Sequence, residues 1–213
     1  MIYVVGGMKY GVGKTTTAVN LAVYLSERKN RDVLLIDSDP SECASEFMRW
    51  RYKNNENLKM TSIQLHGASI THDVSKLENK FDDIVIDSGV GENLSNALNI
   101  ADRLIVPFNS KDLGLWTVWT LTNLETAVDR ALENNSKLKA YSFFISKPEE
   151  KDSNKEVINT LKNSQHIEFI EGSPLHKDTY AKAMNKGYSI YDIKFPEKSS
   201  SVEMTKIFEG VNL

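Results

Sequence analysis

The stretch that most restricts how this chain folds runs from Gly6 to Thr17 and reads GGMKYGVGKTTT. The apolar run Ile2–Val5 precedes it and is typical of a buried strand. Apolar residues then recur at helical spacing between Ala18 and Leu25. A phosphate-binding loop requires this order of strand, glycine-rich turn and helix, because the backbone N–H groups of the turn and the helix N-terminus converge on phosphate oxygens.

The same stretch carries side chains of the types that a nucleoside triphosphate and its metal need. Lys14 would contact the β- and γ-phosphates, and the Thr15 hydroxyl would ligate Mg2+. The predicted nucleotide-binding residues are Gly11, Val12, Gly13, Lys14, Thr15 and Thr16. The alternative is a glycine-rich turn with incidental lysines, which the flanking strand and helix make the poorer interpretation.

The loop departs from the usual G-x-x-x-x-G-K-[ST] pattern, because Met8 stands where the first glycine belongs and a second lysine, Lys9, follows it. With this lysine the sequence resembles the deviant Walker A ATPases, whose loop reads K-G-G-x-G-K-[ST]. Within them it is similar to the ParA partition ATPases, in the short form without an N-terminal DNA-binding domain. The resemblance continues through residues 15–22 and 33–40, whereas Tyr10 replaces the first glycine of the family's pair.

Two further apolar runs end in aspartates. Val33–Ile36 leads into Asp37 and Asp39, and Ile84–Ile86 leads into Asp87. Carboxylates at the C-terminal ends of parallel strands face the ligand crevice of an open α/β sheet, so Asp87 is predicted to lie near Mg2+. A solvated turn and a capping acid are the alternatives. Because a phosphate-binding loop precedes these aspartates in the sequence, a ligand-binding role is the better interpretation than either alternative.

The resemblance also implies a role for each charged residue. Asp39 would position or activate the attacking water, and Asp37 would lie near the metal. Lys9 would reach the phosphates of a second subunit, so that the catalytic set is Lys9, Lys14 and Asp39. The segment Ser88–Gly91 resembles the family's switch loop. Ser146–Lys147 stands where the family often has an Asn–Arg pair beside the base, which leaves the base contact open.

Strands alternate with helices along the whole sequence, which predicts a doubly wound, mainly parallel sheet flanked by helices, as in P-loop NTPases. Residues 1–213 would form a single P-loop ATPase domain. The predicted helices include 41–54, capped by Ser41, and 112–134, capped by Asp112. In the latter, Trp116 and Trp119 can share one face, with core packing as the default interpretation and a partner surface as the second.

Composition excludes several classes of protein. The net charge of −3 gives no overall basic signature of a nucleic-acid-binding protein. The single cysteine, Cys43, excludes an intrachain disulfide and a cysteine-paired metal site, and it fits a reducing cytoplasm. No apolar run has the length needed to cross a bilayer, and the chain begins directly in a strand, which predicts no signal peptide. We therefore expect a cytoplasmic location without membrane attachment.

The leading hypothesis is an ATP- and Mg2+-dependent ATPase that forms a homodimer on binding ATP and segregates a plasmid or chromosome. The resemblance implies a centromere-binding, ParB-like partner, nonspecific DNA as the track and association with the nucleoid. Candidate DNA contacts are Lys177, Lys182, Lys186, Lys194 and Lys198. The alternatives are a small metabolic phosphoryl-transfer or ligase enzyme and a MinD-like positioning ATPase. The tail from Ser199 carries Lys206 as its only basic residue, which disfavours a basic membrane helix.

Overall fold

The computed structural model describes residues 1–54, 58–109, 115–145, 155–172, 178–193 and 198–212. Its centre is a sheet of seven strands in the order β3-β2-β4-β1-β5-β6-β7, in which every pairing is parallel. The predicted parallel sheet is therefore confirmed, with β1 at its centre. The strands are β1 Ile2–Val5, β2 Val33–Asp37, β3 Met60–Gln64, β4 Asp83–Asp87, β5 Arg103–Asn109, β6 Lys139–Ile145 and β7 Ile167–Phe169.

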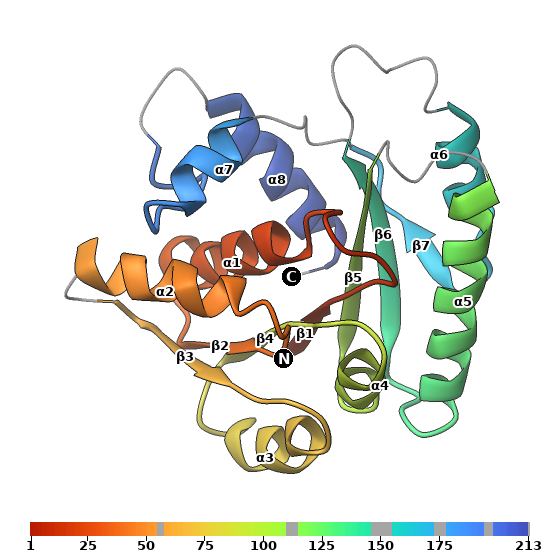
Figure 1. Cartoon of the computed structure of the whole chain (residues 1–213), viewed down its shortest axis with the longest axis horizontal. Coiled ribbons are helices and arrows are strands. Elements are labelled where there is room, and N and C mark those ends of the chain that lie inside the picture. The colour runs from red at the N-terminus through yellow and green to blue at the C-terminus, as the bar shows by residue number, and fades with distance from the viewer. Residues whose placement is uncertain (55–57, 110–114, 146–154, 173–177, 194–197, 213) are drawn as a thin grey trace.

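Helices cover both faces of the sheet. One face carries α1, α2, α7 and α8, and the other carries α3, α4, α5 and α6 (Figure 1). The first helix continues into a π-helical turn, η1, over Tyr24–Arg28. The helix bounds are α1 Lys14–Val23, α2 Cys43–Asn54, α3 Ser69–Leu77, α4 Glu92–Leu98, α5 Leu115–Leu132, α6 Lys155–Lys162, α7 Asp178–Met184 and α8 Lys198–Gly210.

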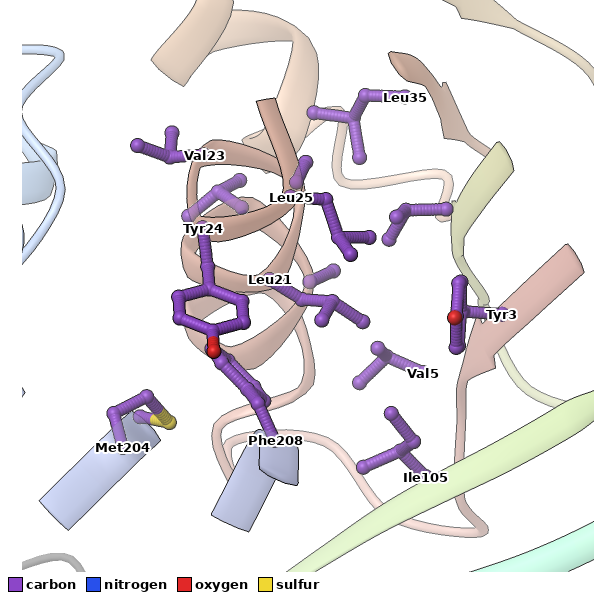
Figure 2. Close-up of a cluster of buried hydrophobic side chains, with 14 of the residues drawn as sticks. Tyr3, Val5, Leu21, Val23, Tyr24, Leu25, Leu35, Ile105, Met204 and Phe208 are labelled. Carbon is purple, nitrogen blue, oxygen red and sulfur yellow. The ribbon is translucent and has the colours of Figure 1, made fainter. Parts of the chain in front are cut away.

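The alternation of side chains along β1 divides the core into two halves. Tyr3 and Val5 point to the face covered by α1, whereas Ile2 and Val4 belong to the cluster beneath α4 and α5. Figure 2 shows the first cluster, in which Phe208 of α8 packs near residues of α1. Because both faces are buried, the strands can be apolar throughout, as the runs in the sequence are.

One predicted helix start differs from the structure, and a second lies outside the described residues. Ser41 does not cap α2, which begins at Cys43. Instead the side chain of Asp37, at the end of β2, accepts a hydrogen bond from the backbone N–H of Ser45 at 2.7 Å. A tertiary contact thus satisfies a helix N–H that a local cap would otherwise satisfy. Asp112, the predicted cap of the long helix, lies outside the described residues.

The exposure of residues on α5 and α8 tests two expectations from the sequence. Trp119 of α5 is 56% exposed, so core packing is the wrong interpretation for this residue, while the side chain of Trp116 lies outside the described part. In α8, Met204, Ile207 and Phe208 are buried against the core. No helix in the described ranges is long and apolar enough to span a membrane.

Candidate functional site

The loop between β1 and α1 is held open by glycine conformations. Gly11 has φ of 72° and Gly13 has φ of 101°, which L-residues with a Cβ rarely adopt. Gly13 directly precedes α1, and a Cβ there would lie 3.0 Å from Cδ1 of Ile145. The Asn109 side chain, at the end of β5, donates a hydrogen bond to the Gly11 carbonyl at 3.1 Å. The loop is therefore fixed from the neighbouring strand.

Lys14 is the first residue of α1, and its side chain lies inside the loop. The residue is only 5% exposed, and its ammonium donates a hydrogen bond to the Lys9 carbonyl at 2.7 Å. The ammonium also lies 5.0 Å from the centre of the Tyr10 ring, which is a cation–π contact. Burial lowers the pKa of Lys14, and the nearby carboxylates of Asp39 and Asp87 oppose that shift.

The predicted acidic residues meet at one edge of the sheet. Asp37 and Asp87 are register partners in the adjacent strands β2 and β4. Asp37 accepts backbone N–H groups with both oxygens, from Asp39 at 3.2 Å and from Ser45 at 2.7 Å. Asp39 is 4% exposed and accepts the N–H of Ser41 at 2.9 Å. Asp37 thus organises the loop that carries Asp39.

Asp87 differs from these two aspartates, because it is fully buried and no backbone N–H donates to either carboxylate oxygen. Burial raises its pKa to about 8, and repulsion from Asp37 and Asp39 adds to the rise, whereas a side-chain interaction with the Thr15 hydroxyl and the charge of Lys14 oppose it. An unpaired buried carboxylate is costly unless a cation or proton compensates it.

The buried Asp87 carboxylate is suited to a Mg2+ site. Among the described residues no group of three or more His, Cys, Asp or Glu side chains forms a complete metal cage. Mg2+ is usually held by one or two carboxylates together with waters and substrate phosphates rather than by a cage. Thr15 and Asp87 beside a phosphate loop fit that description.

The loop Ser88–Gly91, after β4, packs against the loop after β2. The Ser38 hydroxyl donates to the Asp87 carbonyl at 3.1 Å, and the Asn93 side chain donates to the Ser38 carbonyl at 2.7 Å. A Cβ on Gly89 would lie 3.1 Å from that same Ser38 carbonyl oxygen. These contacts therefore hold the C-terminal ends of β2 and β4, which carry Asp37 and Asp87, next to each other.

A cavity of about 630 Å³ opens beside the phosphate loop. Its phosphate end is lined by all six predicted nucleotide-binding residues and by Asp39. Lys9, Asp37 and Asp87 do not line it. The cavity continues between α2 and α7, where the lining includes Phe47, Trp50, Tyr180, Ala181 and Met184. Sequence reasoning did not assign these wall residues to the site, and Ser146 and Lys147 lie outside the described residues.

A family model described as the CobQ/CobB/MinD/ParA nucleotide binding domain matches residues 3–190. The carboxysome distribution maintenance protein A of Halothiobacillus neapolitanus is 21% identical over 210 residues, which are 97% of this chain and 94% of that protein. An ATP complex of a variant of McdA from Cyanothece is similar with a TM-score of 0.76 at 19% identity, over 100% of this chain and 96% of the other. A putative plasmid partition protein from Borrelia burgdorferi bound to AMPPNP gives a TM-score of 0.72 at 21% identity, over 98% and 97%.

The arrangement of the phosphate loop and the acidic strand ends is that expected of a nucleotide-binding domain. The phosphate loop follows the central strand, and the acid-ended strands β2 and β4 lie beside it. The family model covers most of the chain, from β1 to the segment after α7. The chain therefore belongs to the CobQ/CobB/MinD/ParA family of nucleotide-binding domains.

Proposed function

We propose that this protein is an ATPase whose nucleotide-dependent dimerisation and nonspecific DNA binding segregate a plasmid or chromosome. The single observation that carries the ATPase activity is the proximity of two buried charged groups, Lys14 and Asp87, at the phosphate loop. The Lys14 ammonium lies inside the phosphate loop, and the buried Asp87 carboxylate, to which no backbone N–H donates, lies at the end of the neighbouring strand. A triphosphate would supply negative charge beside Lys14, and its Mg2+ would supply positive charge beside Asp87.

Each residue has a role in this proposal. Lys14 would neutralise the β- and γ-phosphates, and the Thr15 hydroxyl and Asp87 would hold Mg2+, which would supply positive charge beside the phosphates. Asp39 positions or activates the attacking water from its buried place on the cavity wall. Asp37 supports the metal shell by fixing the loop that bears Asp39. Lys9 acts on the phosphates of the second subunit.

The cargo and partners rest on the relatives. Similarity to the putative plasmid partition protein of Borrelia supports a plasmid or chromosome as the cargo. A centromere-binding, ParB-like partner and a nucleoid location complete this proposal. The carboxysome distribution protein supports a second candidate, in which a related ATPase positions a cargo other than DNA. MinD-like positioning belongs to this second candidate. The burial of the apolar face of α8 offers little support for membrane cycling through that helix.

The test is an ATP-turnover assay with arbitrary double-stranded DNA and the purified product of the gene immediately downstream. We expect slow basal turnover that rises only when DNA and the partner protein are both present. Lys14→Ala serves as the inactive control. Turnover that responds to a small metabolite and ignores DNA and protein would reject partition in favour of a metabolic phosphoryl-transfer enzyme. Stimulation by the partner without any effect of DNA would favour positioning of another cargo.

A further inference from the structure

The residues that follow α7 form a strap, which we define as Gly187–Asp192, and this strap is tied to the phosphate-loop helix. Asn20 of α1 is fully buried and accepts a hydrogen bond from the backbone N–H of Ile190 at 2.8 Å. The amide nitrogen of the same side chain donates to the Thr16 carbonyl at 2.7 Å. The buried Asn20 side chain therefore links the strap directly to the backbone of Thr16, a predicted phosphate-binding residue.

Arg51 ties the strap to α2. This arginine is 3% exposed, and one terminal nitrogen donates to the Gly187 carbonyl at 3.1 Å and to Asp192 at 2.8 Å. Its other terminal nitrogen pairs with Glu27 of η1. Asp192 also accepts the backbone N–H and the hydroxyl of Ser189, at 2.6 and 2.8 Å. The guanidinium thus closes the strap at both ends and joins it to two helices.

The two elements that Arg51 joins continue into the opposite walls of the cavity. Its guanidinium carbon lies 5.8 Å from the centre of the Phe47 ring, and Phe47 lines the cavity from α2. On the other side, the strap continues from α7, which lines the cavity with Met184. Gly187 packs so closely on the backbone of Trp50 and Arg51 that a Cβ would overlap it. The contacts of Arg51 and Gly187 therefore contribute to the spacing between α2 and α7, as does the Asn54 side chain of α2, which donates to the Lys186 carbonyl.

The phosphate end of the cavity is held by different contacts. There the loop is fixed by Asn109 and by the glycine conformations, and the N-terminus of α2 is fixed by Asp37. Arg51 does not itself line the cavity. A change at Arg51 should therefore move the walls at the end remote from the phosphates more than the phosphate loop, which the strap reaches only through Asn20.

We infer that Arg51 is a positioning residue of the nucleotide site, which holds α7 at the distance from α2 that the nucleoside part of the ligand requires. This inference rests on the proposed nucleotide function. Removing one partner from a buried charge network leaves the others uncompensated, so the strap loosens when the guanidinium is lost. The nucleoside contacts then weaken, whereas the phosphate contacts remain.

The experiment compares two ligands that share the phosphate chain, ATP and inorganic tripolyphosphate, each with Mg2+, by isothermal titration calorimetry. For Arg51→Met we expect ATP to bind about 10-fold more weakly, while tripolyphosphate affinity changes by less than about 2-fold. Arg49→Met is the matched control, because Arg49 lies on the same helix but is exposed and pairs with Glu42 and Glu46 on the surface. Neither affinity should change in that variant. Arg51→Lys should recover part of the ATP affinity.

Equal losses for both ligands would indicate general destabilisation and overturn the inference, as would unchanged ATP binding. If Arg51→Met does not fold, Asp192→Asn is measured against the same predictions, because it weakens the same ion pair and keeps the shape of the side chain. Wild-type protein that binds neither ligand would overturn the nucleotide site and this inference with it. Wild-type protein that binds both ligands, with no difference between them in the variants, would overturn the inference alone.

Discussion

Asp37 and Asp87 lie directly opposite each other at the C-terminal ends of β2 and β4, yet their carboxylates have opposite surroundings. Both oxygens of Asp37 accept backbone N–H groups, whereas in the described structure no backbone N–H donates to either oxygen of Asp87. The first aspartate therefore shapes the loop and the start of α2. The second aspartate is available to bind a cation.

The first prediction concerns Asp87 and pH. Its folded-state pKa of about 8 lies above the ordinary value of 3.8, so the folded protein retains a proton that the unfolded chain has released. The unfolding free energy of the nucleotide-free protein should therefore fall as the pH rises between about 4 and 8. Asp87→Asn should flatten this dependence in urea unfolding. Equal slopes for wild type and variant would show that Asp87 does not titrate in this range.

The second prediction concerns the phosphate loop. Lys14→Ala should abolish tight MgATP binding, with a loss of at least about 100-fold, because a desolvated triphosphate loses its main cationic partner. Thr15→Ala should weaken only the Mg2+-dependent part of the affinity. Calorimetry with and without Mg2+ measures both. Wild-type affinity in Lys14→Ala would contradict the assignment of the loop.

Asp39→Ala should slow hydrolysis by about 100-fold while the affinity for ATP changes little, because a contact with the attacking water contributes mainly in the transition state. Single-turnover kinetics with saturating enzyme separates the two effects. Asp37→Ala is the companion variant, since it should displace the Asp39 loop. Unchanged turnover in Asp39→Ala, together with its loss in Asp37→Ala or Asp87→Ala, would transfer the catalytic role to another aspartate.

The Tyr10 side chain departs from the family pattern, and its ring is 65% exposed at the mouth of the loop. We expect Tyr10→Gly to tighten ATP-dependent dimerisation, because glycine lets the backbones of two facing loops approach closely. Sedimentation with a slowly hydrolysed ATP analogue measures the association. Weaker association in the variant would make the ring a working part of the interface, and no change would show that the ring avoids it.

DNA binding should be nonspecific and should weaken steeply as salt rises, because phosphate contacts release counterions. Lys182 and Lys186 are exposed, near the end of α7 and just beyond it. Lys177 and Lys194 lie outside the described residues, as does the side chain of Lys198. Replacing Lys182 and Lys186 together with Gln should lower ATP-dependent retention on arbitrary DNA about 10-fold at low salt. Retention equal to wild type would remove these two lysines from the proposed DNA surface.

The sequence alone predicted the phosphate loop, the two acid-ended strands and the parallel sheet. These features depend on local chemistry: glycines permit the dihedral angles of the loop, and continuous apolar runs are typical of strands buried on both faces. The start of α2 was predicted wrongly, because its N–H groups are satisfied by Asp37 from another element rather than by Ser41 nearby. Periodicity likewise could not show that Trp119 faces outward.

Only the tertiary structure decided how the site is completed. Arg51 meets Asp192 across 141 residues, and Asn20 meets Ile190 across 170. Neither pair has a sequence signal, because a hydrogen bond between distant segments depends on how the helices pack and not on spacing along the chain. The difference between Asp37 and Asp87 has the same origin. Both end a buried strand with the same side chain, and the backbone groups that reach one carboxylate but not the other are set by the folded arrangement around them.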